Sequence, residues 1–207
     1  MPFRRAYPDL PQADALENLI SSRVLAGADK AAIDAQIWAE FGETWAVMFT
    51  DLSGFSRGVE AFGIIHFLQI IHESYRLFLP CIDAHSGTLL KTEGDSLLVI
   101  FPTPADALGA AIAMQAATVA YNKNTLPEEQ VLLCVGLGYG PMLKIGDVDI
   151  YGAQVNAASK LGEDTAQSGE ILCTDEFKQA VGVPPQVAFS SIGAVMNMKS
   201  SSWKIAF

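Results

Sequence analysis

The chain has 207 residues, and its 13 lysines and arginines against 23 aspartates and glutamates give a formal net charge of −10 at pH 7. Half of the residues are hydrophobic, so the chain can bury a full core, and wholesale disorder is excluded. A surface this acidic repels phosphate backbones and anionic lipids, which disfavours nucleic acids and membranes as general partners.

Residues 1–43 predict a helical N-terminal extension. Three prolines interrupt its first eleven residues, and the stretches that follow carry apolar residues at helical spacing. Asp29 is placed to cap the second of its two helices. We therefore expect this extension to precede one domain over residues 44–207, which is an ordinary size for a single domain.

From Trp45 onward, the hydropathy pattern predicts alternating strands and helices. The expected elements are a strand over 45–52, a long helix from Val59 that ends before Gly87, strands over 88–92 and 96–101, a helix over 102–122, a strand over 131–139, a helix over 153–163, a strand over 170–174, and a strand-like tail over 187–207 with a serine-rich turn at 200–202. The first six elements follow the order β-α-β-β-α-β, which is the ferredoxin-like arrangement. We therefore expect an α+β fold in which helices cover an antiparallel sheet, with additions at the C-terminal end.

Two patterns are assigned a structural role only. The glycines of the Gly136–Gly140 segment (GLGYG) predict a strand packed closely against another backbone, because Pro141 follows them where a dinucleotide-binding loop would open a helix. The three cysteines are widely spaced and odd in number, which predicts reduced core thiols.

No apolar run reaches the roughly 18 residues that span a bilayer, and no apolar stretch follows the two N-terminal arginines. We therefore expect a cytoplasmic protein without a membrane span.

The expected topology brings two carboxylates to one edge of the sheet. The first and third strands of the ferredoxin-like core are antiparallel neighbours, so Asp51 at the end of one lies beside Asp95 at the start of the other. Adjacent carboxylates raise each other's pKa unless a cation lies between them, and hard oxygen ligands suit Mg²⁺ or Mn²⁺. The turn after Asp51 leads into a helix and can bind phosphate. Together these features favour two-metal phosphoryl or nucleotidyl transfer, although singly they are also typical of a helix cap and a turn residue.

Three motifs resemble those of the class III adenylyl and guanylyl cyclase catalytic domains, over about residues 45–180. Phe49–Phe55 (FTDLSGF) resembles the first metal motif, and Lys91–Asp95 (KTEGD) resembles the second. Asp149–Lys160 (DIYGAQVNAASK) resembles the third, with its polar residues at offsets of seven and four. Three motifs in the right order with the right internal spacing make this signal specific.

The resemblance implies a metal set and a phosphate-binding turn. The metal set comprises Asp51, Leu52 and Asp95, which would hold two Mg²⁺ or Mn²⁺ ions per site. The substrate-binding turn comprises Ser53, Gly54 and Phe55. One ion would activate the ribose 3′-oxygen for attack on the α-phosphorus, and the other would neutralise the triphosphate.

The resemblance also implies how the substrate is recognised. Lys91 would donate to a ring nitrogen of adenine, and Asp149 would accept from its exocyclic amine. Guanine-using relatives place Glu and Cys at these two positions. Asn156 would orient the ribose, and Lys160 would stabilise charge on the α-phosphate. A lysine near the C-terminus, Lys199 or Lys204, would bind the terminal phosphate.

These roles imply an adenylyl cyclase of signal transduction, a lyase that converts ATP to 3′,5′-cyclic AMP and pyrophosphate. In such enzymes a homodimer shares its sites, with the metal carboxylates from one chain and the other groups from its partner. The alternative is a weak or inactive cyclase-homology domain that binds ATP and acts as a regulatory module. Lys160 favours this alternative, because the family has Arg there and Lys lacks the bidentate fork. Residues 142–148 are also shorter than the family's dimerisation arm. A nucleotide hydrolase is less favoured, since Lys91 and Asn156 would have no purpose.

Overall fold

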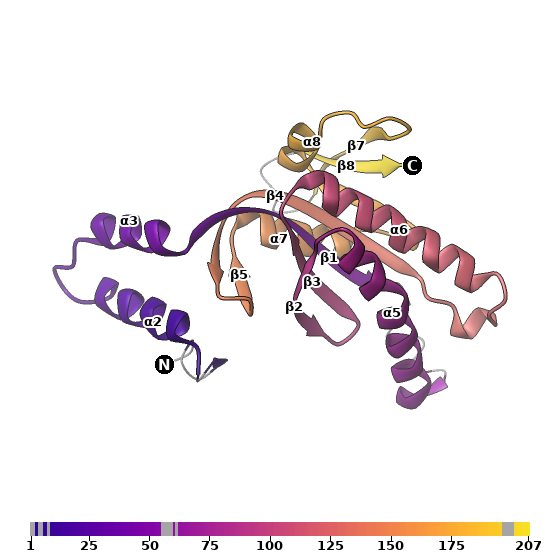
Figure 1. Ribbon diagram of the computed structural model, residues 1–207, viewed down its shortest axis with the longest axis horizontal. Coiled ribbons are helices and arrows are strands. Elements are labelled where there is room, and N and C mark those ends of the chain that lie inside the picture. The colour runs from indigo at the N-terminus through magenta and orange to yellow at the C-terminus, as the bar shows by residue number, and fades with distance from the viewer. Residues whose placement is uncertain (1–2, 4–5, 8, 55–59, 61, 196–200) are drawn as a thin grey trace.

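The computed structural model describes residues 3, 6–7, 9–54, 60, 62–195 and 201–207 (Figure 1). The strands are β1 (Gly42–Leu52), β2 (Thr88–Glu93), β3 (Ser96–Phe101), β4 (Leu133–Ile145), β5 (Asp149–Tyr151), β6 (Ile171–Thr174), β7 (Ala188–Ala194) and β8 (Ser201–Ala206). The helices are α2 (Pro11–Arg23), α3 (Lys30–Phe41), α5 (Ile64–Ala84), α6 (Pro104–Asn122), α7 (Ala153–Ser159) and α8 (Asp175–Val181), with short helical turns η1 (Pro127–Glu129) and η2 (Lys160–Thr165).

The strands form one sheet in the order β2-β3-β1-β4-β6-β8-β7, and β5 pairs with the outer part of β4. Its first four members carry the β-α-β-β-α-β connectivity that the sequence predicts, with β1 and β3 antiparallel neighbours. The pairing of β4 with β6 is parallel, so the sheet is mostly rather than wholly antiparallel. The expected α+β fold with C-terminal additions is therefore confirmed.

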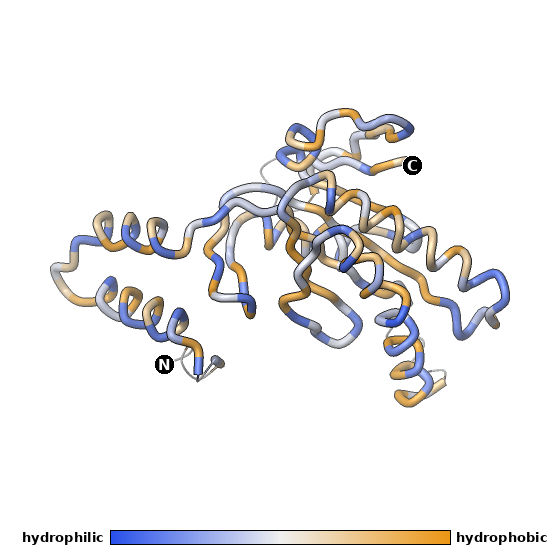
Figure 2. The backbone as a smooth tube through the Cα atoms, in the orientation of Figure 1, coloured by the Kyte–Doolittle hydropathy of each residue, from blue (hydrophilic) through white to orange (hydrophobic). Residues whose placement is uncertain are grey.

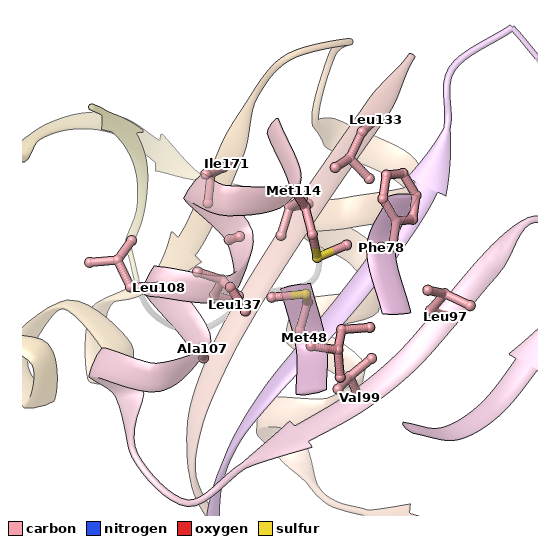
Figure 3. Close-up of a cluster of buried hydrophobic side chains, with 14 of the residues drawn as sticks. Met48, Phe78, Leu97, Val99, Ala107, Leu108, Met114, Leu133, Leu137 and Ile171 are labelled. Carbon is pink, nitrogen blue, oxygen red and sulfur yellow. The ribbon is translucent and has the colours of Figure 1, made fainter. Parts of the chain in front are cut away.

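Strand β1 is central because its middle residues are apolar on both faces. Met48 packs into the main core, which α5 and α6 cover, together with residues such as Phe78 and Met114 (Figure 3). The preceding residue of the strand, Val47, points to the opposite face and packs against Val155 of α7. Alternation along one strand therefore builds two core layers, one on each side of the sheet.

Helix α7 can lie close to the sheet because β4 is rich in glycine. A Cβ atom built on Gly136 would lie 2.0 Å from the carbonyl oxygen of Ala158 and 2.5 Å from the nitrogen of Gly162. No side chain fits in that space, which confirms the prediction of close backbone packing at the GLGYG segment. This packing fixes α7, the helix that carries the third cyclase-like motif.

The N-terminal helices lie beside the β4–β5 ribbon, away from the main body of the sheet (Figure 1). Hydrophobic and hydrophilic residues alternate along α2 and α3, as Figure 2 shows. The apolar side chains of the two helices pack around Ile145 and Leu143 of β4. The Asp29 side chain accepts from the Ala32 N–H at 3.0 Å, so the predicted cap is confirmed. Helix α3 runs directly into β1, and the division of the chain at residue 43 stays a prediction.

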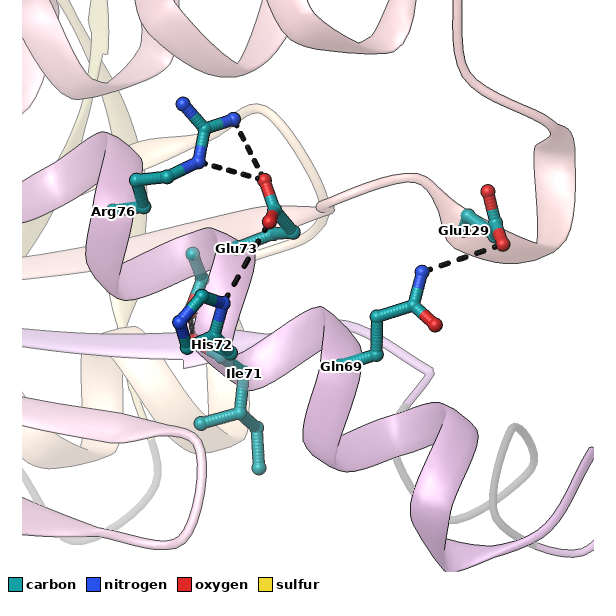
Figure 4. A network of polar contacts seen from close by, with 7 residues as sticks. Gln69, Ile71, His72, Glu73, Arg76 and Glu129 are labelled. Atoms are coloured by element: carbon teal, nitrogen blue, oxygen red, sulfur yellow. Dashed lines mark hydrogen bonds and ion pairs between the residues drawn. The ribbon is translucent and has the colours of Figure 1, made fainter.

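The long helix α5 begins later than predicted. It starts at Ile64, because the preceding residue, Gly63, has a φ of +85° that a helix cannot continue through. Phe62 therefore lies outside the helix, and Val59 lies outside the described residues. Polar contacts fix the exposed side of α5: Glu73 pairs with Arg76 at 2.7 Å, and Gln69 reaches Glu129 of η1 (Figure 4).

Strand β4 is longer than predicted. It passes through Pro141 to Ile145, because it pairs with β1 as far as Leu143 and with β5 beyond that, and the missing proline N–H removes only one ladder bond. The predicted helix over 153–163 is instead α7 followed by the wider π-helical turn η2. Helix α8, capped by the Thr174 hydroxyl, was not predicted. Of the turn predicted over 200–202, Ser201 and Ser202 belong to β8, and Ser200 lies outside the described residues.

The three cysteines are free thiols. Cys134 and Cys173 are buried, and burial raises the pKa of each to about 12, as expected of core thiols. Cys81 is only half-buried. No helix within the described residues is both long and apolar enough to cross a bilayer.

Candidate active site

The two carboxylates predicted to bind metal, Asp51 and Asp95, lie together at the end of β1. The register pairs Thr50 with Leu97, which sets Asp51 opposite the start of β3 and next to the β2–β3 turn. The Leu52 N–H donates to Asp95 Oδ2 at 3.2 Å, and the Ser96 hydroxyl donates to Asp51 Oδ1 at 3.4 Å. The topology predicted from the sequence therefore brings Asp51 and Asp95 to one edge of the sheet.

The electrostatics of this edge favour a cation. Burial raises the pKa of Asp51 to about 6, and the charges of Asp95 and Glu163 add to the effect. Burial likewise raises the pKa of Asp95, and Glu163 contributes again. The pair consists of hard oxygen ligands whose ionised forms are disfavoured. A bound divalent ion would offset the free-energy cost of ionising them. The residues present therefore fit Mg²⁺ or Mn²⁺.

The protein supplies few ligands at this edge. Within the described residues, no group of three or more His, Cys, Asp or Glu side chains is placed to hold a metal ion. An ion held by two carboxylates would complete its coordination with water and substrate oxygens, as Mg²⁺ commonly does in phosphoryl-transfer sites.

Part of the turn that follows Asp51 is already hydrogen-bonded within the fold. The Ser53 N–H donates to the Leu132 carbonyl at 2.8 Å, so that amide is already bonded. Gly54 is exposed, with a φ of +90°. Ser53 and Gly54 line a small cavity of about 160 Å³ beside Phe67 of α5. Phe55 lies outside the described residues, and phosphate binding by this turn stays a prediction.

The two residues predicted to recognise the base form an ion pair. Lys91 Nζ on β2 lies 2.7 Å from Asp149 Oδ2 on β5, and Asp149 is 2% exposed. The same Oδ2 atom accepts from the Tyr7 hydroxyl at 2.6 Å and the Tyr151 hydroxyl at 2.5 Å, while Oδ1 accepts from the Ile150 N–H at 2.8 Å. A carboxylate with four donors is held in one orientation.

These contacts decide the protonation of the pair. Burial alone would raise the pKa of Asp149, but the hydrogen bonds from Lys91, Tyr151 and Tyr7 outweigh it and lower that pKa. Burial alone would lower the pKa of Lys91, but the bond to Asp149 outweighs it and raises that pKa. Both groups therefore stay charged near neutral pH, with one offering donors and the other acceptors.

Asn156 and Lys160 both lie on the α7–η2 segment. Asn156 is exposed on α7, and Lys160 is half-buried where α7 gives way to η2. The Lys160 carbonyl accepts from the Thr165 hydroxyl at 2.8 Å, which stabilises the wide turn. Of the two C-terminal lysines, Lys204 pairs with Glu170 at 2.6 Å, and Lys199 lies outside the described residues.

Sequence reasoning missed three residues of this site. Tyr151 stands two residues from Asp149, so strand alternation could have placed both side chains on one face. Glu163 is exposed, as a solvated polar residue should be, yet its charge acts on both metal-site carboxylates. Tyr7 is separated from Asp149 by 142 residues, and no local pattern links them.

The fold is that of a nucleotidyl cyclase catalytic domain. Residues 39–203 match the adenylate and guanylate cyclase catalytic domain family, and the chain belongs to that family. It is 29% identical over 143 residues to a protein of Mycobacterium bovis named adenylate cyclase. The matched region covers 63% of this chain and 32% of that protein. The chain spans a third or less of the length of the curated relatives it matches.

Solved structures agree in fold. An adenylate/guanylate cyclase/hydrolase from Silicibacter pomeroyi superposes with a TM-score of 0.67 at 25% identity, covering 79% of this chain and 95% of that one. The adenylyl cyclase CyaB from P. aeruginosa superposes with a TM-score of 0.65 at 21% identity, covering 80% of this chain and 95% of that one. At 21% identity, the second structure supports the fold alone.

Proposed function

We propose that this chain is an adenylyl cyclase, which converts ATP to 3′,5′-cyclic AMP and pyrophosphate. The observation that carries the proposal is the charged pair of Lys91 and Asp149. Adenine presents a ring nitrogen that accepts a hydrogen bond beside an amine that donates one. A lysine beside an aspartate offers the complementary donor and acceptor, and a site built on such polar groups rejects a base that leaves them unpaired.

The remaining residues position the reacting groups. Asp51 and Asp95 would hold two divalent ions, which when bound would promote loss of the ribose 3′-hydroxyl proton and neutralise charge on the triphosphate. Asn156 orients the ribose, so that its 3′-oxygen faces the α-phosphorus. Lys160 donates to an α-phosphate oxygen, where negative charge increases as the new bond forms.

The working unit in this proposal is a homodimer with shared sites. The contacts of Lys91 and Asp149 involve tyrosines of the same chain, and those of Asp51 and Asp95 involve Leu52 and Ser96, so the residues fall into two separate groups. One chain would supply the carboxylate group to a site, and its partner would supply the base-recognition group with Asn156 and Lys160.

A second candidate is a cyclase-homology module that binds ATP but turns it over very slowly. Lys160 favours it, because an ammonium offers a point charge where a guanidinium offers two parallel donors. The two functions differ in product. Purified protein incubated with ATP and Mn²⁺ should form cyclic AMP, with GTP in a parallel reaction as the control for base choice. Nucleotide binding without cyclic product would favour the module.

A further inference from the structure

The base-recognition pair is occupied by a residue from the N-terminal end of the chain. The Tyr7 hydroxyl donates to Asp149 Oδ2 at 2.6 Å, the same oxygen atom that Lys91 Nζ contacts at 2.7 Å. Tyr7 is half-buried, whereas Asp149 beneath it is 2% exposed. A base that binds this pair must therefore reach a carboxylate that is covered.

The tyrosine hydroxyl has the hydrogen-bonding polarity of an adenine edge. It can accept from an ammonium such as that of Lys91 while it donates its proton to Asp149, as the ring nitrogen and the amine of adenine would do together. Asp149 Oδ2 already receives Lys91, Tyr7 and Tyr151, which exceeds the two lone pairs of a carboxylate oxygen. A further donor can bind there only after one of these three leaves.

Of the three donors to Asp149 Oδ2, Tyr7 is the one that can move away. Tyr151 lies on β5 two residues from Asp149, and Lys91 lies within β2, so both are fixed by the sheet. Tyr7 lies outside the sheet and is attached through α2: its N–H donates to the Phe3 carbonyl at 2.9 Å, and the Phe3 N–H donates to Glu17 of α2 at 2.9 Å.

The interface that holds this segment is incompletely packed. Phe3 rests edge-on against Tyr151, with ring centroids 6.0 Å apart. An open pocket of about 250 Å³ lies where Phe3, α2, α3 and the ribbon meet, lined by Phe3, Leu16, Trp38 and Tyr151 among others. The apolar surfaces around it are not in full contact, so separating them gives up fewer packing contacts.

We infer that Tyr7 is an autoinhibitory plug, which takes the place of adenine on Lys91 and Asp149 and must leave before ATP binds. The inference rests on the proposed function, because it assigns regulation to that same base site. Anything that draws Tyr7 away from the β4–β5 ribbon would expose the pair and activate the enzyme.

Substituting Tyr7→Phe tests the plug, since it keeps the ring and removes the competing hydroxyl. Binding of α,β-methylene-ATP with Mn²⁺ is measured by calorimetry for wild type, Tyr7→Phe, Tyr7→Ala and the control Tyr121→Phe. Tyr121 lies on α6, remote from β5, and its variant should bind as wild type does. Losing the hydrogen bond between the Tyr7 hydroxyl and the charged Asp149 should tighten analogue binding about tenfold in both Tyr7 variants. In turnover, KM should fall by a similar factor with kcat unchanged, whereas a merely structural defect would lower kcat and the Tm.

Hydrogen exchange gives a second measurement that is independent of turnover. The Tyr7 amide, bonded to Phe3 in the plugged state, should exchange faster when the analogue binds wild type. Equal affinity for wild type and both Tyr7 variants, with unchanged exchange, would overturn the plug and leave the cyclase proposal standing. If folded wild type and both Tyr7 variants all failed to bind the analogue, the adenylyl cyclase proposal would fail and the plug with it.

Discussion

Asp51→Asn is expected to abolish turnover and to stabilise the metal-free protein at neutral pH. Burial, with the charges of Asp95 and Glu163, raises the pKa of Asp51 from 3.8 to about 6. The folded state therefore binds this proton more tightly than the unfolded state does, and stability falls as the pH rises from about 4 to 6. Above pH 6 the ionised carboxylate destabilises the fold until a cation binds.

The size of this effect follows from the pKa. A pKa difference of about 2 corresponds to about 3 kcal/mol. Asp51 is only partly buried, so solvent screens part of the effect, and we expect the asparagine to add about 1–2 kcal/mol at pH 8. For a chain of 207 residues this is a Tm rise of about 2–8 °C.

The assay is thermal unfolding in EDTA at pH 4 and pH 8, repeated with Mn²⁺. The variant should be the more stable protein at pH 8, and the difference should disappear by pH 4. Mn²⁺ should raise the Tm of wild type more than that of the variant. Asp83→Asn, an exposed substitution on α5, is the matched control and should change little. An Asp51→Asn protein that is less stable than wild type at pH 8 would contradict this prediction, because the carboxylate would then support the fold.

Three further predictions concern the chemistry. Lys160→Arg should raise kcat and Lys160→Ala should lower it about ten- to a hundredfold, measured as steady-state cyclic AMP production; an alanine variant equal to wild type would remove Lys160 from the site. Lys91→Glu with Asp149→Cys should shift preference from ATP toward GTP by about tenfold or more, and a wild type that already prefers GTP would contradict the assignment. Asp51→Asn and Asn156→Ala proteins, each inactive alone, should regain partial activity when mixed, and no recovery between exchanging chains would argue against shared sites.

The approach of Asp51 to Asp95 could be predicted from the sequence because it is a consequence of strand order. A continuous apolar run, a long helix and a tight hairpin leave few topologies, and in the ferredoxin-like one these two strand ends meet. The structure then adds what strand order cannot contain, which is the charge of Glu163 acting on the same pair. That residue belongs to η2, whose wide turn depends on backbone packing against β4 rather than on any local pattern.

The role of Tyr7 could not be predicted, for a different reason. The N-terminal residues resemble those of any amphipathic segment, and their docking depends on apolar contacts with the far end of β4. Element boundaries failed where tertiary pairing outweighs local signals: β4 continues through Pro141 because β1 pairs with it there. The motif residues on β2 and β5 were placed by resemblance, and their mutual contact needed the structure.

We propose that this chain cyclises ATP at a site whose base is recognised by Lys91 and Asp149. Mass spectrometry of the products formed from ATP and from GTP by the purified full chain with Mn²⁺, for wild type and Tyr7→Phe, tests this directly. We expect 3′,5′-cyclic AMP and pyrophosphate, less cyclic GMP, and more cyclic AMP from Tyr7→Phe at ATP concentrations below KM. Folded protein that yields no cyclic nucleotide in either form, or that yields chiefly cyclic GMP, would contradict this proposal.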